Sequence, residues 1–274
     1  MKIFIDSAKI EEITFLSKIG ILDGVTTNPS LIKSAVEEQM FNGNKIDMFY
    51  YIVKILETVG KGKSVSLEVA STNYEQMVKE GLVLYKKFNK FAKNVFIKIP
   101  INTATSKGDN DFEGLKAINY FSREGIPVNC TLIFTPEQAL MAAKAGAAIV
   151  SPFAGRIDDM LREKARMKFQ KSDYFSGFEP TKVKGKSLED NGIISGVNLV
   201  SKIVQIFKKY EIKTQVLAAS IRNARQFREC ALVGVDIVTA PLTVILDSLK
   251  HEKTVEGVNK FSFDVVQEYR EILR

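Results

Sequence analysis

The sequence predicts a single (β/α)8 barrel. Short segments rich in β-branched and aromatic residues alternate with helical patterns from the first residue onward. Eight such strand–helix units fit within the 274 residues, which is an ordinary size for this fold. No linker interrupts the alternation, so one domain over residues 1–274 is expected. A doubly wound sheet is the alternative, but no Gly-rich phosphate loop follows any predicted strand.

The strands are expected to alternate with helices, and two further helical segments are expected to close the chain. The predicted strands are Lys2–Asp6, Gly24–Thr27, Ser64–Ala70, Asn94–Pro100, Pro127–Thr131, Ala147–Pro152, Thr214–Ala219 and Asp236–Thr239. The predicted helices are Ala8–Lys18, Ile46–Thr58, Asn73–Ala92, Asp111–Arg123, Pro136–Ala145, Ile194–Lys209, Ile221–Leu232, Leu242–Leu249 and Val255–Leu273. Capping residues support several of these boundaries: Thr135 and Pro136 open one helix, and Gly146 follows its last residue.

Two segments depart from the simple barrel pattern. Ile157–Gly192 follows the sixth strand, carries many charged residues and is too long for a plain loop. We expect an extra helix at about Asp158–Lys171 and an excursion on the catalytic face; a solvated surface insertion is the alternative. The amphipathic C-terminal helix, Val255–Leu273, is expected to pack on its own barrel or on a neighbouring copy, which leaves a homo-oligomer open.

The charge balance favours a small anionic ligand. The chain has 39 Lys and Arg residues against 32 Asp and Glu residues, a net charge of +7. The basic residues are spread along the chain and no nucleic-acid motif accompanies them, so a phosphorylated metabolite fits better than a polynucleotide. His251 is the single histidine, so no metal site built from clustered His and Cys is expected, and no cofactor is predicted.

The cysteine content and the absence of targeting signals predict a cytoplasmic protein. Cys130 and Cys230 lie far apart in apolar segments, which indicates a reducing compartment rather than a disulfide framework. The first residues reach Asp6 too early for a signal peptide, and no apolar run approaches the length of a membrane span. No membrane partner is therefore expected.

Lys98 is the most unusual residue of the predicted strands. It lies in the middle of Asn94–Pro100, with apolar neighbours on both sides. Burial disfavours a charged ammonium, so a lysine held there is expected to lose its proton more easily than in water. A neutral amine can form a Schiff base with a carbonyl substrate. The alternative is a lysine at a strand end that extends its charged head into solvent.

Polar residues gather at the carboxyl ends of seven predicted strands, where barrel enzymes place their chemistry. They are Asp6 on the first strand, Thr26 and Asn28 on the second, Glu68 on the third, Lys98 on the fourth, Asn129 and Thr131 on the fifth, Ser151 and Phe153 followed by Arg156 on the sixth, and Ser220 and Arg222 after the seventh. Each has a plain structural explanation, since Asp6 or Asn28 could cap a helix and Glu68 could be a partnered ion. Together they predict one site.

This set has a chemical logic. Loss of water from a carbinolamine needs a proton relay, which Glu68 and the Thr131 hydroxyl could form through a bound water. Cleavage of a carbon–carbon bond then needs a base, for which Asp6 is available. Hydroxyl groups can be bound by the amides of Asn28 and Asn129. Arg156 and Arg222 suit a phosphate, with the Ser220 hydroxyl beside them.

In this order along the chain, these residues and their neighbours resemble the transaldolase family, and the resemblance covers nearly the whole sequence. The matching segments are Asp6, Val25-Thr26-Thr27-Asn28-Pro29-Ser30, Ser66-Leu67-Glu68-Val69, Ile97-Lys98-Ile99-Pro100, Asn129-Cys130-Thr131-Leu132, Ser151-Pro152-Phe153-Ala154-Gly155-Arg156 and Ala219-Ser220-Ile221-Arg222-Asn223. The resemblance implies a metal-free (β/α)8 enzyme that moves a dihydroxyacetone unit between sugar phosphates in the non-oxidative pentose phosphate pathway.

The resemblance also implies a role for each residue. Lys98 would be the Schiff-base lysine and Asp6 the acid/base for carbon–carbon cleavage, while Glu68 and Thr131 would hold the catalytic water. The residues implied for the dihydroxyacetone unit are Asn28, Asn129 and Ser151, and those implied for phosphate are Arg156, Ser220 and Arg222. A related subgroup, the fructose-6-phosphate aldolases, has Tyr at the place of Phe153 and Gln at that of Glu68, so this chain carries the transaldolase pattern.

Two other functions remain open at this point. A fructose-6-phosphate aldolase would release free dihydroxyacetone without needing an acceptor. A catalytically inactive barrel would bind sugar phosphates or a partner without turnover, although the intact lysine and carboxylates argue against it.

Overall fold

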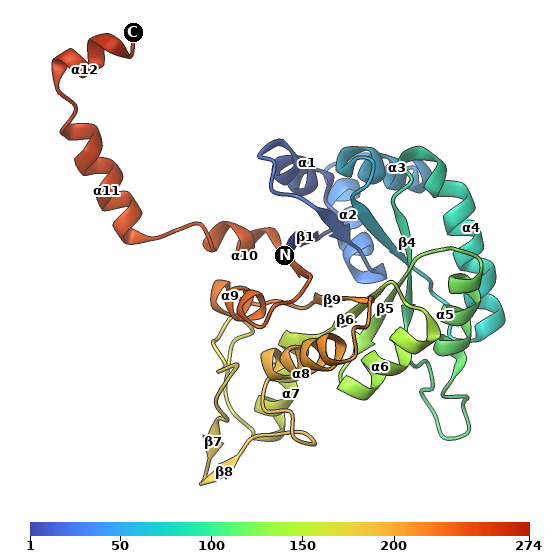
Figure 1. The fold of residues 1–274 in the computed structure, drawn as a ribbon. Helices are drawn as coiled ribbons and strands as arrows, with labels where there is room; N and C mark the ends of the chain where they lie inside the picture. Colours follow the sequence, from blue (N-terminus) through green and yellow to red (C-terminus); the bar gives the residue numbers. More distant parts are fainter.

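The computed structural model describes residues 1–274, and its eight main strands close into a parallel barrel surrounded by helices (Figure 1). The order around the barrel is β1-β10-β9-β6-β5-β4-β3-β2. The strands are β1 (Lys2–Asp6), β2 (Gly24–Thr26), β3 (Ser64–Glu68), β4 (Val95–Pro100), β5 (Val128–Ile133), β6 (Ile149–Pro152), β9 (Gln215–Ala218) and β10 (Ile237–Ala240). The (β/α)8 prediction is confirmed, and every predicted strand is present.

Most helices follow the prediction, but one was omitted, and α7 and the C-terminal helix differ from their predicted bounds. They are α1 (Ile10–Lys18), α2 (Pro29–Phe41), α3 (Met48–Val59), α4 (Tyr74–Ala92), α5 (Glu113–Arg123), α6 (Pro136–Ala145), α7 (Ala154–Lys164), α8 (Gly196–Lys209), α9 (Ala224–Leu232), α10 (Leu242–Asp247), α11 (Glu252–Phe263) and α12 (Gln267–Ile272). Helix α2 was not predicted. Its start is nevertheless encoded locally, because the Asn28 side chain accepts a hydrogen bond from the Leu31 N–H and Pro29 occupies the first helical position.

The segment after the sixth strand differs from its prediction. Helix α7 begins at Ala154, four residues before the predicted start, and ends at Lys164. The inserted segment therefore follows α7 and contains a short antiparallel hairpin, β7 (Lys182–Val183) and β8 (Lys186–Ser187), which was not predicted. The hairpin projects away from the barrel, and the rest of the segment contacts α7 and α9 (Figure 1).

The C-terminal helix is also divided. Residues Asp264–Val266 separate α11 from α12, and neither helix buries a residue. Both extend away from the barrel in Figure 1. The C-terminal arm that α11 and α12 form therefore does not pack on its own barrel. None of the helices combines the length and apolar character needed to span a membrane.

The barrel interior has an apolar floor beneath a polar layer. Phe4, Ile149, Leu217 and Ile237 are buried together inside the ring of strands, apart from the larger core between the strands and the helices. The Phe4 ring fills the space that a side chain at Gly24 would need, since a Cβ there would lie 2.5 Å from it. Two residues further along three of these strands, the inward positions are polar: Asp6 follows Phe4, Ser151 follows Ile149 and Thr239 follows Ile237. The alternation of strand residues therefore places the site above this floor.

A glycine fixes the approach of α5 to the end of β4. A Cβ at Gly114 would lie 2.1 Å from the Pro100 carbonyl oxygen and 2.8 Å from that of Ile101, which are backbone atoms. We expect Gly114→Ala to destabilise the fold by about 1–3 kcal/mol, although alanine favours helices. Urea unfolding followed by circular dichroism measures this change. Gly257→Ala is the matched control, because the nearest atom to its Cβ is 4.0 Å away in exposed α11; equal effects of the two substitutions would contradict this packing argument.

Candidate active site

Lys98 lies inside the barrel and is only 4% exposed. The register of neighbouring strands sets Glu68 of β3 directly beside it, and Lys98 Nζ lies 3.0 Å from Glu68 Oε2. The same nitrogen donates a hydrogen bond to the Thr27 carbonyl oxygen at 3.1 Å. The alternative of a lysine that reaches into solvent is therefore wrong. A buried amine held beside a carboxylate can exchange its proton with that carboxylate and act as a nucleophile.

Asp6 forms a second acidic centre at the end of β1. Its Oδ1 accepts a hydrogen bond of 2.7 Å from Thr26 Oγ1, and Thr26 Oγ1 is also 2.7 Å from Thr239 Oγ1. Burial raises the pKa of the Asp6 carboxyl above its usual value, opposed by the Thr26 hydrogen bond and by the charges of Lys98 and Arg222. A carboxyl with a raised pKa is a stronger base than one in water, so Asp6 suits proton transfer.

The fifth and sixth strands supply an amide and hydroxyl groups. Ser151 Oγ donates to Asn129 Oδ1 at 2.6 Å, and Asn129 Nδ2 donates to Ser66 Oγ at 3.0 Å. The Thr131 hydroxyl is buried and has no hydrogen-bond partner among the protein atoms. The next residue, Leu132, adopts a positive φ of 58° where the β5–β6 register shifts. Such an irregularity re-aims strand residues beside a site.

A narrow cavity joins most of these groups. It is lined by Asp6, Thr26, Asn28, Lys98, Thr131, Ser151, Phe153, Leu217, Ala219 and Thr239. Asn28 Oδ1 caps α2, as one of its two explanations expected, and the residue also borders this cavity. Glu68 and Asn129 do not line the cavity, but each contacts a residue that does, namely Lys98 and Ser151 respectively. The structure therefore brings the strand-end residues of the first six strands to one place.

The predicted phosphate residues lie at the edge of this site, where α7 begins. The Phe153 and Ala219 backbones pair, and the Gly155 N–H donates to the Ser220 carbonyl oxygen at 3.1 Å. Arg156 is exposed, with its guanidinium 5.2 Å from the centre of the Phe153 ring. Arg222 is instead paired, with its Nη2 3.0 Å from Asp159 Oδ2.

Three polar side chains of this arrangement were not predicted, those of Ser66, Thr239 and Asp159. Ser66 and Thr239 share the inward parity of Glu68 and Ile237, so the period of two along their strands was a usable signal. No local pattern distinguishes Asp159, because its partner Arg222 is 63 residues away in sequence.

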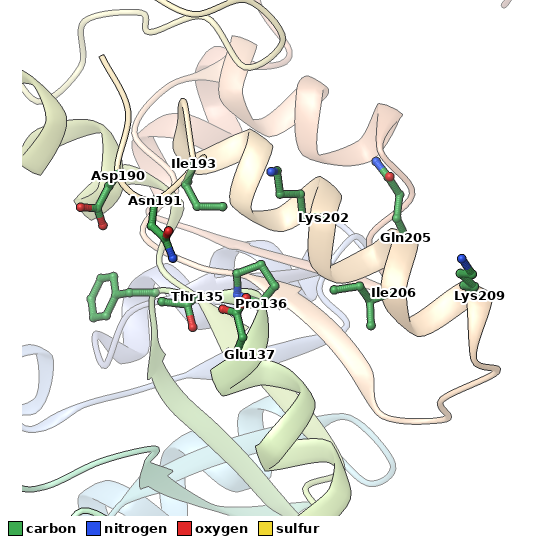
Figure 2. Close-up of a pocket in the computed structure, with 11 residues that line it drawn as sticks. Thr135, Pro136, Glu137, Asp190, Asn191, Ile193, Lys202, Gln205, Ile206 and Lys209 are labelled. Atoms are coloured by element: carbon green, nitrogen blue, oxygen red, sulfur yellow. The ribbon is translucent and has the colours of Figure 1, made fainter. Parts of the chain in front are cut away.

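A larger pocket of ≈ 350 Å³ lies outside the barrel, between the start of α6 and α8 (Figure 2). It runs from Thr135 and Asn191 along α8 to Lys209, and none of the predicted site residues lines it. Phe134 borders this pocket, and its ring lies 5.9 Å from that of Phe153, which borders the inner cavity. The pocket and the inner cavity are therefore bordered by two aromatic rings that lie close to each other.

A barrel that holds a buried lysine beside two acidic residues has the equipment of an enzyme acting on a carbonyl substrate. The comparisons with known proteins assign the chain to such a class. Residues 3–272 match the family model described as transaldolase/fructose-6-phosphate aldolase. The chain belongs to this family.

Similar proteins carry the same name in distant organisms. A probable transaldolase of Phocaeicola vulgatus is 39% identical over 264 residues, covering 96% of this chain and 97% of that protein. A probable transaldolase of Thermoplasma acidophilum is 39% identical over 265 residues, covering 96% and 95%. One from Methanococcus vannielii is 38% identical over 264 residues, covering 96% and 97%.

Proposed function

We propose that this protein is a transaldolase that works through a Schiff base on Lys98. It would transfer a dihydroxyacetone unit from sedoheptulose 7-phosphate or fructose 6-phosphate to glyceraldehyde 3-phosphate or erythrose 4-phosphate, in the non-oxidative pentose phosphate pathway. The observation that carries the proposal is the Lys98 amine, buried in the polar layer of the barrel 3.0 Å from Glu68. The family assignment and the names of its relatives agree with it.

The first chemical step joins the donor to Lys98. The amine, having passed a proton to Glu68, adds to the ketose carbonyl carbon and gives a carbinolamine. Its hydroxyl must then leave as water, which needs a proton donor close to the reacting carbon. In this proposal Glu68, which contacts Lys98, and the Thr131 hydroxyl, which has no hydrogen-bond partner in the protein, hold a water that relays this proton.

The second step breaks the carbon–carbon bond. Asp6 takes the proton of the substrate hydroxyl on the far side of that bond, the first aldose leaves, and the electron pair is held as an enamine on Lys98. The raised pKa of Asp6 favours this proton transfer. Addition of the enamine to the acceptor aldehyde reverses the same proton movement, and water then frees the amine.

The remaining residues bind the substrate. In this proposal the side chains of Thr26, Asn28, Asn129 and Ser151 contact the hydroxyl groups of the transferred unit, and the Phe153 ring borders it. Arg156, Ser220 and Arg222 bind the phosphate. These binding roles are supported by the positions of the residues, which lie around one cavity or at its edge.

The proposal is tested by measuring products from fructose 6-phosphate with and without erythrose 4-phosphate. A transaldolase forms sedoheptulose 7-phosphate and glyceraldehyde 3-phosphate only when the acceptor is present. Equal release of glyceraldehyde 3-phosphate without an acceptor, together with free dihydroxyacetone, would identify a fructose-6-phosphate aldolase. If no product forms with or without the acceptor, the remaining alternative is the catalytically inactive barrel.

Phe153 is expected to limit release of free dihydroxyacetone, because its ring offers no proton to the enamine. Phe153→Tyr adds a phenol at the cavity wall, so we expect the aldolase rate without acceptor to rise by about 10-fold relative to transfer. Dihydroxyacetone formation measured by coupled reduction checks this ratio. Phe134→Tyr is the matched control, since the Phe134 ring lies 5.9 Å from that of Phe153 but does not line the cavity; a similar rise in both variants would argue against the role.

Two further parts of the proposal concern location and assembly. Both cysteines are free and buried, which fits a cytoplasmic protein in a reducing compartment. The exposed apolar side chains of the C-terminal arm, including Val255, Val258 and Phe261, support a homo-oligomer in which this arm is covered. Light scattering of the full chain and of a chain ending at Leu249 tests the second point, and the same number of subunits in both would contradict it.

A further inference from the structure

Two adjacent acidic residues of α7 face the loop that carries Arg222. Asp159 lies 3.0 Å from the Arg222 guanidinium, and both side chains are largely shielded, at 14% and 24% exposure. Asp158 reaches the same loop indirectly. Its Oδ2 accepts a hydrogen bond of 2.8 Å from Gln226 Nε2, and Gln226 Oε1 accepts one of 2.8 Å from the Arg222 N–H. Arg222 is therefore held by its side chain and by its backbone.

The backbone contacts leave this loop little freedom to move away from α7. A Cβ at Gly155 would lie 2.1 Å from the Ser220 carbonyl oxygen and 2.5 Å from Arg222 Nε, so only glycine allows this approach. Gly155 and Asp159 are four residues apart and share one face of α7. Asp158 also accepts a 2.6 Å hydrogen bond from the Gly196 N–H, which ties the start of α8 to the same network.

We propose that Asp159 is a positioning residue for phosphate binding, which holds the Arg222 guanidinium at the edge of the site, while Asp158 and Gln226 fix the backbone beneath it. The inference rests on the proposed function, because it assigns Arg222 to the phosphate of the substrate. Arg222 and Asp159 are joined by a single hydrogen bond rather than by a bidentate pair. Arg222 Nε and Asp159 Oδ1 are both buried without a hydrogen-bond partner, so one contact alone sets the direction of the guanidinium.

Asp159 exerts two opposing effects on a bound phosphate, and its replacement by alanine separates them. Its negative charge repels the phosphate, while its contact with Arg222 removes the freedom of a long side chain that would otherwise have to be ordered when the phosphate binds. Repulsion alone predicts tighter phosphate binding by Asp159→Ala. Positioning predicts weaker binding. It also predicts partial rescue by Asp159→Asn, whose side-chain oxygen can still accept the Arg222 hydrogen bond without a charge.

The test compares a phosphorylated donor, fructose 6-phosphate, with the phosphate-free donor fructose. For Asp159→Ala we expect KM for fructose 6-phosphate and the inhibition constant of inorganic phosphate to rise together by about 10-fold, a 1.4 kcal/mol change. We expect kcat to stay within about threefold and kcat/KM for fructose to be unchanged. Asp159→Asn should recover most of the affinity. Asp190→Ala is the control. It removes the exposed ion pair between Asp190 and Lys164 of α7, and it should leave the kinetic constants for both donors unchanged.

Three results would overturn the inference. They are an unchanged or lower KM for fructose 6-phosphate in Asp159→Ala, an equal loss of kcat/KM for both donors, and no recovery in Asp159→Asn. The wild-type protein separates this inference from the proposed function. If it turns over fructose 6-phosphate with an acceptor while Asp159→Ala behaves like wild type, only the positioning role fails. If the wild type shows no transfer, the proposed function fails as well.

Discussion

Replacing Lys98 with methionine is expected to abolish transfer, lowering kcat by about 10³-fold or more, because no other amine reaches the cavity to form the Schiff base. Methionine has nearly the length of lysine and fills the same space without a nucleophile. Steady-state measurement of glyceraldehyde 3-phosphate release with erythrose 4-phosphate as acceptor gives the rate. Substrate binding should persist, since the groups proposed for the hydroxyls and the phosphate are unchanged.

Borohydride trapping connects this loss of rate to a covalent intermediate. Reduction of the wild-type protein in the presence of fructose 6-phosphate should add a three-carbon adduct at Lys98, identified by mass spectrometry of its peptide. Lys9 and Lys116 are suitable internal controls, since both are paired on the surface and should remain unmodified. An active Lys98→Met protein, or an adduct at another lysine, would remove the chemical basis of the proposed function.

The stability of the protein is expected to fall as pH rises toward neutrality, because of Asp158. This residue is 5% exposed, and burial raises its pKa from 3.8 to about 7, against the hydrogen bond from Gly196 and the charge of Arg162. The folded state therefore binds a proton that the unfolded state has already released. The contribution of this bound proton to the stability of the fold is complete below pH 4 and is lost as pH rises through 7. Over that range the shift corresponds to about 4 kcal/mol.

Asp158→Asn should remove this pH dependence. Urea unfolding at pH 5, 6, 7 and 8 would show a decline in the free energy of unfolding for the wild type, and a flatter profile for the variant. The slope is the relevant quantity, because the substitution also alters the hydrogen bond to Gln226 and so changes the absolute stability. Asp190→Asn, at an exposed carboxylate, should retain the wild-type slope; parallel profiles for wild type and Asp158→Asn would contradict the expected titration.

The strands of the barrel and the inward direction of their side chains could be predicted from sequence because both depend on short-range patterns. A charged residue between apolar neighbours, as at Lys98, is unusual in a buried strand and therefore marks a candidate site residue. The pairing of Lys98 with Glu68 also follows from neighbouring strands in register. Helix α2 was missed although Asn28 and Pro29 mark its start, because its apolar residues form a weak stripe; only Ala35 is buried.

Contacts between distant helices were beyond the reach of these patterns. The Asp159–Arg222 pair joins α7 to the loop before α9, and nothing in either segment specifies the other. The division of the C-terminal helix at Asp264–Val266 was missed for a related reason. Its apolar residues, such as Phe261 and Phe263, have no partner within the chain that would fix a single helical face.

The apolar floor formed by Phe4, Ile149, Leu217 and Ile237 has a consequence for the order of events in catalysis. Because this floor closes one end of the barrel, substrates can enter the site only from the other end, at the carboxyl ends of the strands. The departing aldose and the incoming aldehyde must use it in turn, so the enzyme cannot hold both at once. Initial-rate plots against one sugar at several fixed levels of the other should therefore give parallel lines, the pattern of a double-displacement reaction.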